Sequence, residues 1–101
     1  MANVAFDVDG TLIDEADDAP RDDIIRLLKK HHERGDNVYV WSGGGVGYAS
    51  DWVRRLGLAA YVAGCIPKRV TPGIDITYDD QRVKLGKVNH CVGPGLYEER
   101  W

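Results

Sequence analysis

Apolar residues in the N-terminal part of the chain occur first as a short run and then at helical spacing. Residues 4–8 form a mostly apolar run rich in strand-forming side chains, and a turn sequence follows it, so this run predicts a strand. In residues 20–34 the apolar positions fall on one helical face and Gly35 follows the last turn, which predicts a helix. Asp17 or Asp18 is the candidate N-cap of this helix.

The middle of the chain repeats this alternation of strand and helix. Residues 38–41 predict a second strand, which ends at a glycine-rich bend. Apolar side chains then recur at helical spacing until a glycine, and they predict a second helix over residues 48–56. Residues 61–64 predict a weak strand and residues 74–78 a clearer one. The pattern of residues 83–101 assigns no element.

Polar residues follow the predicted strands at the same end. Strands that alternate with helices are typical of a parallel sheet, because parallel neighbours need a helix-sized connection between them. Ligand sites in such sheets form beyond the carboxyl ends of the strands. The side chains at these ends are Asp7 and Asp9, Ser42, and Asp79 with Asp80. We therefore expect these residues to share one rim of the sheet.

The composition is that of one globular domain spanning residues 1–101. Of the 101 residues, 44% are hydrophobic and 29% are charged, which is enough apolar material for one core. The 13 Lys and Arg residues against 16 Asp and Glu residues give a net charge of −3, and this provides no general attraction for nucleic acid. No apolar run approaches the roughly 20 residues of a membrane-spanning helix, so we expect a soluble, cytoplasmic protein.

The cysteines and the C-terminal residues are interpreted as structural. Without a secretion signal, Cys65 and Cys91 are predicted to be reduced, buried thiols. Residues 90–101 are predicted to be a loose tail, although Tyr97 and Trp101 could dock on a neighbouring subunit.

The segment Asp7-Val8-Asp9-Gly10-Thr11 carries two carboxylates at the point where the first strand gives way to a turn. On a strand, both carboxylates would point to the same face. Gly10 lets the backbone swing away after Asp9, and the Thr11 hydroxyl can tie the turn to nearby amides. An unpaired charge in an apolar strand is costly, and a metal ion would supply the missing partner of Asp7.

This segment resembles the DxDGT signature of the haloacid dehalogenase superfamily of phosphohydrolases. Further motifs follow in the order of that family. The strand that ends in Ser42 resembles its second motif, and Lys68 resembles the third, a lone basic residue. Asp79–Asp80 resembles the fourth, an acidic pair at a strand end. The resemblance covers about residues 4–81.

The resemblance implies a Mg²⁺-dependent phosphatase on a Rossmann-like, three-layer α/β sandwich with a small, mostly parallel sheet. Asp7 would be the nucleophile that forms an aspartyl-phosphate, and Asp9 would be the general acid and base. Mg²⁺ would be bound by Asp7, by Asp9 through its backbone carbonyl, and by Asp79 or Asp80, between which the sequence does not choose. We expect the carboxyl groups of Asp7 and Asp9 to surround this cation together with the acidic pair.

By the same resemblance, a small set of donors would hold the phosphoryl oxygens. Ser42 and the amides of Gly43 and Gly44 would donate hydrogen bonds, and Lys68 would supply positive charge. Lys68 is preferred because it precedes the fourth predicted strand by a few residues; the other basic residues nearby are Arg69, Lys84 and Lys87.

No cap domain fits between the motifs. Only residues 13–19 separate the first motif from the first predicted helix, and residues 43–67 have room for a bend, one helix and a short strand. An open site suits a phosphorylated macromolecule, such as a polymer end or a protein, or an oligomer whose neighbour closes the site. A phosphorylated small molecule stays open as a substrate. Nucleic acid is expected only as a substrate end, and no membrane partner is expected.

Two rival functions fit parts of the pattern. A non-catalytic phosphate-binding or partner-binding module could keep this fold. A receiver-like phospho-acceptor domain also uses acidic residues, a hydroxyl and a Lys on a parallel sheet, but its acceptor Asp belongs at the end of an internal strand, where Ser42 stands. The order of the motifs favours the phosphatase over the receiver, whereas loss of catalysis is left open.

The remaining aromatic and histidine residues are interpreted as structural. Trp41, Trp52 and Tyr48 recur at strand and helix spacing and are predicted to be core residues. His31 and His32 fall at the end of the first predicted helix, where an imidazolium is favourable beside the helix dipole.

Overall fold

The computed structural model describes residues 1–97. Within these residues, three strands and two α-helices alternate along the first two-thirds of the chain, and two further strands follow. In chain order the elements are β1 (Asn3–Asp7), α1 (Asp22–Glu33), β2 (Asn37–Trp41), α2 (Val46–Arg55), the short 3₁₀ helix η1 (Ala59–Tyr61), β3 (Gly64–Cys65), β4 (Ile76–Asp79) and β5 (Val88–Cys91). None of the helices in residues 1–97 has the length and apolar character needed to cross a bilayer.

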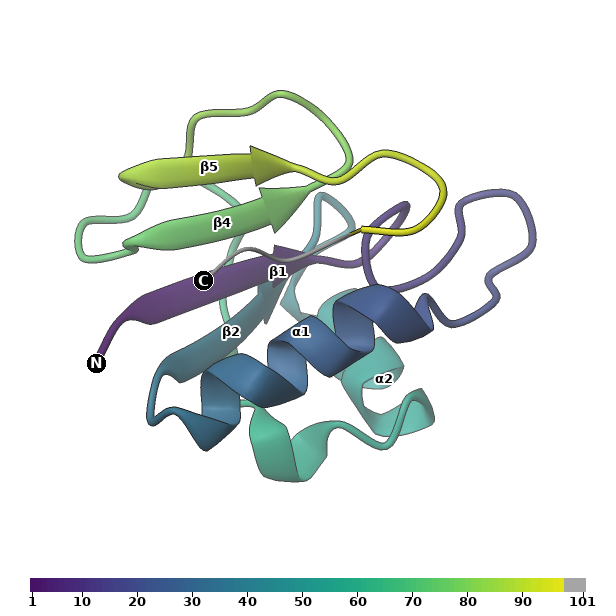
Figure 1. Ribbon diagram of the computed structural model, residues 1–101, viewed down its shortest axis with the longest axis horizontal. Helices are drawn as coiled ribbons and strands as arrows, with labels where there is room; N and C mark the ends of the chain where they lie inside the picture. Colours follow the sequence, from purple (N-terminus) through teal and green to yellow (C-terminus); the bar gives the residue numbers. More distant parts are fainter. Residues whose placement is uncertain (98–101) are drawn as a thin grey trace.

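The strands form one sheet in the order β3-β2-β1-β4-β5, with β1 at its centre (Figure 1). Every strand pair is parallel, and the register sets Asp7 opposite Trp41 of β2. The parallel α/β architecture expected from the sequence is therefore confirmed. Because all strands point the same way, their carboxyl ends meet at one edge of the sheet.

The two faces of the sheet are covered differently. Both helices contribute to one large core on the face of Val4, Phe6, Val38 and Val40. The opposite face carries a small cluster of Ala5, Trp41 and Ile74, which loop residues cover. In the described residues, the third layer expected from the sequence thus consists of loops. The connections that precede and follow β4 are too short to form packed helices.

Several elements differ from the sequence prediction. Helix α1 begins at Asp22 with Arg21 at its N-cap, whereas Asp17 accepts a hydrogen bond from the Ala19 amide and Asp18 has a positive φ of 59° in the preceding turn. The strand predicted over residues 61–64 is wrong except at Gly64, since η1 occupies its start. Strand β5 lies in the segment to which the pattern assigned no element.

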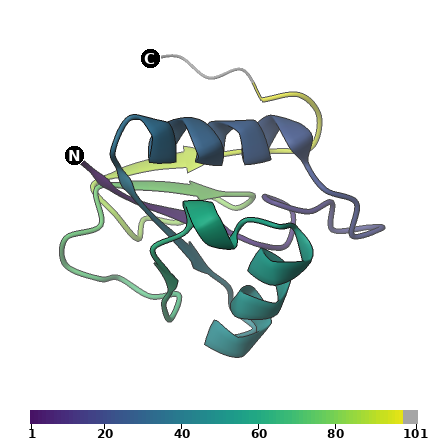
Figure 2. The same ribbon diagram turned by 90° about the horizontal axis from the view of Figure 1, so that it is seen from below.

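The prediction of a loose tail over residues 90–101 is wrong for its first part. His90 and Cys91 belong to β5, and Val92 is buried. The Arg21 guanidinium then donates hydrogen bonds to the carbonyls of Gly93 at 2.8 Å and Gly95 at 2.6 Å. Figure 2 shows this segment (yellow) turning over the N-terminal end of α1. Residue 97 is fixed by a hydrogen bond from its amide to Asp23, and Trp101 lies outside the described residues.

The burial of several residues interpreted as structural differs from the prediction. Trp41 is fully buried as predicted, but Trp52 is half-buried and Tyr48 is 37% exposed. The two cysteines are free, as predicted, yet Cys65 is only half-buried and Cys91 is exposed. Neither thiol is therefore a buried core residue.

His31 lies in the last turn of α1, as predicted, and its side chain is fully buried. Its Nδ1 lies 2.8 Å from Asp36 Oδ2 and its Nε2 lies 2.9 Å from the Tyr78 hydroxyl. Burial raises the pKa of Asp36, but the hydrogen bonds from His31 and the Ala2 amide outweigh it and lower the pKa. The Tyr78 ring stacks on Phe6 with 4.7 Å between centroids, so this network ties α1 to β4 through the core.

Replacing His31 by Ala is expected to destabilise the fold by about 2–4 kcal/mol, because it leaves a cavity and removes a partner from a buried carboxylate and a buried hydroxyl. His32→Ala is the matched control, since His32 is the next residue along the chain and its imidazole is exposed. Urea denaturation of both variants measures the difference. Equal stability of the two variants would contradict the structural role of the buried network.

Candidate active site

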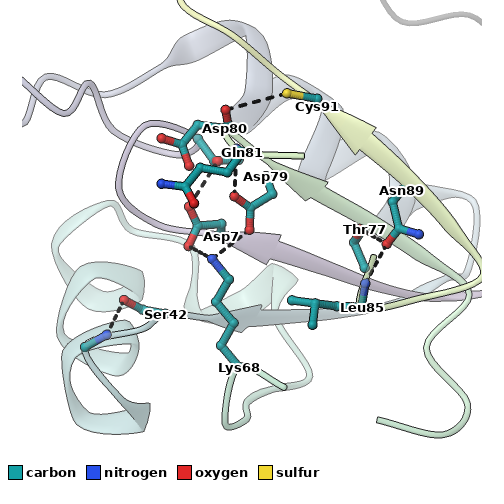
Figure 3. Close-up of polar contacts among 12 residues, drawn as sticks. Asp7, Ser42, Lys68, Thr77, Asp79, Asp80, Gln81, Leu85, Asn89 and Cys91 are labelled. Atoms are coloured by element: carbon teal, nitrogen blue, oxygen red, sulfur yellow. Dashed lines mark hydrogen bonds and ion pairs between the residues drawn. The ribbon is translucent and has the colours of Figure 1, made fainter. Parts of the chain in front are cut away.

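The carboxyl ends of β1, β2 and β4 bring the sequence-predicted residues to one edge of the sheet (Figure 3). Asp7 is the last residue of β1 and Asp79 the last of β4, while Ser42 follows β2 directly. Asp7 is 4% exposed and Asp79 is 1% exposed. Two carboxyl groups are thus buried at the ends of neighbouring strands.

Asp7, Asp79 and Asp80 form an acidic cluster, in which one carboxylate oxygen of each lies within 4.8 Å of the other two. Lys68 reaches this cluster from the loop after β3 (Figure 3). Its Nζ lies 3.1 Å from Asp7 Oδ1 and 2.7 Å from Asp79 Oδ2. Three carboxyl groups therefore face one ammonium group. Coulomb repulsion among the carboxylates is only partly offset by this single cation.

The surroundings change the pKa values of the cluster. Burial, and then the nearby Asp79, raise the pKa of Asp7 to about 7, although Lys68 opposes the shift. Burial and contacts with Asp79 also raise the pKa of Asp80. Burial lowers the pKa of the Lys68 ammonium, but its contacts with Asp79 and Asp7 outweigh this and leave the pKa above its ordinary value. Both raised carboxyl pKa values thus come first from burial and then from the neighbouring carboxyl groups.

The acidic cluster fits a divalent cation such as Mg²⁺. Hard cations prefer oxygen ligands, and the three carboxyl groups offer them from two strand ends. Asp79 Oδ2 is buried and forms an ion pair with the Lys68 ammonium group, 2.7 Å away. A buried carboxylate oxygen in this state is suited to a metal ion. Asp7, Asp79 and Asp80 are therefore the candidate ligands.

The Asp9 carboxyl group is not a member of the acidic cluster, contrary to the expectation that it surrounds the cation with Asp7. Its Oδ1 instead accepts a hydrogen bond of 2.8 Å from the Tyr48 hydroxyl. This bond is the principal reason why the pKa of Tyr48 is raised. Asp9 follows β1 by two residues, where the turn has already changed the direction of the chain, so strand alternation no longer decides where its side chain lies.

Gly10 and Thr11 build the turn that carries Asp9. Gly10 has a positive φ of 79°, and a Cβ built on it would lie 2.3 Å from Asp80 Oδ2. A larger residue here would displace the Asp80 carboxylate, so glycine is needed both for the turn and for the close approach. Thr11 donates a long hydrogen bond of 3.4 Å from its hydroxyl to Asp7 Oδ2 and its amide bonds to Val8 at 3.1 Å.

Ser42 and the glycines that follow lie at the end of β2, next to β1. Ser42 is buried, and its Oγ accepts a hydrogen bond of 3.0 Å from the Gly44 amide (Figure 3). The Gly44 amide, expected to face a phosphoryl oxygen, is therefore engaged by Ser42 in this structure. A Cβ on Gly43 would meet open space.

The sequence reasoning missed the contribution of Arg21. Its Nη1 donates to the Gly10 carbonyl at 3.2 Å as well as to Gly93, so it supports the turn beside the acidic cluster. A cation at the start of a helix is unfavourable for the helix dipole. Asp23, in the first turn of α1, pairs with this guanidinium at 2.9 Å, so the sequence carried no signal that Arg21 also reaches loop carbonyls.

Comparison with known families assigns the chain on the basis of its N-terminal two-thirds. A family model described as haloacid dehalogenase-like hydrolase matches residues 4–66, more than half of the chain. The chain belongs to the haloacid dehalogenase-like hydrolases. The match includes the segment with Asp7 and Asp9 and the end of β2, but Lys68 and the acidic pair lie beyond it. Neither the curated proteins nor the solved structures contain a match.

For this haloacid dehalogenase-like hydrolase, the structure adds what the family match does not cover. Family membership indicates a hydrolase in general. Lys68, Asp79 and Asp80 come from outside the matched residues, yet the sheet order brings β4 beside β1 and sets them against Asp7. The resemblance of the later motifs noted in the sequence is thus accompanied by spatial convergence with the first motif.

The metal-free hydrolase is expected to lose stability as the pH rises from about 4 to about 7. The pKa of Asp7 in the folded protein, about 7, lies above its ordinary value of 3.8. Between these values the folded state binds more protons than the unfolded state, so raising the pH favours unfolding. Asp80 acts in the same direction. Asp36, with its lowered pKa, is ionised throughout the upper part of this range and does not oppose the trend.

Thermal denaturation in a chelator at pH 5 and pH 8 measures this dependence. We expect a lower melting temperature at pH 8 for the wild type and a smaller difference for Asp7→Asn, which cannot ionise. Asp22→Asn is the matched control, because Asp22 is exposed. A wild-type melting temperature that rises from pH 5 to pH 8 would contradict the raised pKa.

Proposed function

We propose that this haloacid dehalogenase-like hydrolase is a Mg²⁺-dependent phosphatase that hydrolyses a phosphate monoester through an aspartyl-phosphate on Asp7. The observation that carries the proposal is the position of Asp7 at the end of the central strand, in contact with Lys68 and within the acidic cluster. A nucleophilic carboxylate needs positive charge beside it before it can approach a phosphate dianion. Lys68 supplies one such charge from the chain itself.

In the first step an Asp7 carboxylate oxygen attacks phosphorus, and the bond from phosphorus to the leaving oxygen breaks. Asp9, on the turn that follows, would donate a proton to this oxygen as it leaves. In the second step Asp9 takes a proton from water, which attacks the phosphorus and releases Asp7 and inorganic phosphate. Covalent catalysis of this kind divides one difficult displacement into two easier ones.

Asp7, Asp79 and Asp80 would hold Mg²⁺ in this reaction, together with the Asp9 backbone carbonyl. When bound, the ion supplies charge neutralisation for the phosphoryl group and its attacking carboxylate. Asp79 is suited to ligation because its buried Oδ2 is already paired with a cation, Lys68, while the backbone amide of Gln81 fixes its Oδ1 at 3.0 Å. Ser42 would orient the loop before α2, and the Gly43 amide would donate to a phosphoryl oxygen.

The hydroxyl of Tyr48 would influence the proton transfers. It donates to Asp9 Oδ1 and therefore leaves the second carboxyl oxygen of Asp9 to face the substrate. A phosphorylated small molecule and a phosphorylated macromolecule both suit an open site, since few residues separate the motifs and no cap covers the described ones.

The deciding assay measures hydrolysis of a generic aryl phosphate by the whole chain, with Mg²⁺ and after chelation. We expect turnover that requires the ion and that is lost in Asp9→Asn. Phosphate binding without turnover in every condition would support the rival, a catalytically silent phosphate-binding module. Turnover at the same rate in the chelator would exclude a metal-dependent phosphatase.

A further inference from the structure

A cavity of about 420 Å³ lies between the loop that joins β4 to β5 and the edge strand β5. Its volume is in the range of small-ligand sites. Arg82, Lys84 and Lys87 line it, together with His90 of β5. Among the described residues, no Asp or Glu side chain contributes to the lining. The cavity is therefore a positively charged feature in a chain whose net charge is negative.

Two of these cations are available to a ligand. Arg82 and Lys84 are exposed, and neither makes an ion pair within residues 1–97. Lys87 makes one exposed ion pair, 3.5 Å from Asp75. The sequence contains no acidic residue from 81 to 97, and the Asp79–Asp80 pair that precedes this segment belongs to the acidic cluster. Unpaired cations around a concave surface attract anions.

The cavity adjoins the candidate active site. Gln81 lines the cavity, and its backbone amide donates a hydrogen bond of 3.0 Å to Asp79 Oδ1. Cys91, also in the lining, contacts the Asp80 carbonyl through its sulfur at 3.6 Å. Figure 3 shows both residues next to the acidic pair. A substrate with its phosphoryl group at Asp7 would thus have the cavity beside it, on the side of β5.

The loop that carries the cations is held in place by Asn89. The Asn89 Oδ1 accepts hydrogen bonds from the Thr77 hydroxyl at 2.7 Å and from the amides of Leu85 and Gly86 at 3.0 and 2.9 Å (Figure 3). Its Nδ2 donates to the Gly86 carbonyl at 2.9 Å. The loop is therefore already ordered before a ligand binds, which reduces the entropy lost on binding and favours affinity for the ligand.

We propose that this cavity binds a second phosphate or phosphodiester group of the substrate whose first phosphate is hydrolysed at Asp7. The inference rests on the proposed phosphatase function for the fate of the first phosphate. Arg presents a planar set of donors that matches phosphate oxygens, and Lys84 adds a mobile point charge. The substrate class is then an organic bisphosphate or the phosphorylated end of a polynucleotide, which share this chemistry.

The kinetic test compares three substrates: an aryl monophosphate, a nucleoside 3′,5′-bisphosphate and a single-stranded oligonucleotide with a terminal phosphate. In the double variant Arg82→Ala/Lys84→Ala, we expect kcat/KM to fall about tenfold or more for a substrate with a second phosphate. The value for the aryl monophosphate should stay within about twofold. Lys29→Ala/Arg55→Ala is the matched control, since it removes the same two charges from α1 and α2. An unchanged kcat/KM for all substrates, or an equal fall for all three, would overturn the proposal.

A binding test separates failure of this inference from failure of the proposed function. In the Asp7→Asn background, we expect the Kd of the bisphosphate or the oligonucleotide to rise about tenfold when Arg82 and Lys84 are replaced. For an oligonucleotide, the slope of log K against log salt should also fall by about 1.4, or about 0.7 for each cation. An effect on the bisphosphate alone identifies a small-molecule substrate. Charge-dependent binding without turnover in the wild type would support the phosphate-binding cavity and contradict the phosphatase function. Turnover with an unchanged Kd for both ligands would support the phosphatase function and contradict the phosphate-binding cavity.

Discussion

Asp7→Asn is expected to reduce phosphatase turnover by at least about 10³-fold. The substitution keeps the shape of the side chain but removes the nucleophilic carboxylate. The buried position of Asp7 at the end of β1 also makes it the central member of the acidic cluster. The kcat of the purified variant on an aryl phosphate with Mg²⁺ measures the loss.

The control for this prediction is Asp22→Asn, which removes a carboxylate from the exposed first turn of α1. Its turnover should equal that of the wild type. Circular dichroism should show that Asp7→Asn remains folded, because replacing a buried carboxylate with a raised pKa relieves an electrostatic cost. Wild-type turnover in a folded Asp7→Asn protein would refute the proposed nucleophile.

Lys68→Ala is expected to reduce kcat on an aryl phosphate by about 10²–10³-fold. Lys68 makes ion pairs with both Asp7 and Asp79, so its loss removes the ammonium group that faces the reacting carboxylate. The variant should also be less stable than the wild type at pH 8 without metal, because the buried carboxyl groups then ionise without this cation. Steady-state kinetics and thermal denaturation measure the two effects.

Lys84→Ala provides the comparison, since Lys84 is an exposed residue of the cavity beside β5 and an aryl phosphate has no second phosphate to contact it. It should leave kcat on this substrate unchanged. Lys68→Arg should recover part of the stability through its charge, with less recovery of kcat because the guanidinium has a different shape. A strong kcat effect for Lys84→Ala with none for Lys68→Ala would show that another lysine acts on the phosphoryl group.

The central part of the fold could be predicted because each element there has a clear local pattern. The apolar runs that lead to Asp7 and Ser42 form β1 and β2, and the helical spacing between them forms α1. In contrast, β5 has two exposed and two half-buried residues, so burial leaves no alternation to detect. Its pairing with β4 depends on a neighbouring strand, and this information is not local.

The positions of candidate-site residues could be predicted at the ends of strands, but less well in the turns that follow them. Asp7, Asp79 and Asp80 converge because strand direction determines where parallel strands end. The side chain of Asp9 lies after a glycine-permitted turn and bonds to Tyr48 of α2, which two-residue periodicity cannot foresee. The engagement of the Gly44 amide by Ser42 is likewise a local loop contact that composition does not encode.

The central place of β1 has a consequence for how the domain can be divided. A fragment ending at residue 66, where the family match stops, would lack β4 and would leave β1 as an exposed edge with unpaired amide and carbonyl groups. Phe6 would also lose the Tyr78 ring that stacks on it. We therefore expect that a fragment of residues 1–66 does not fold independently and is prone to self-association.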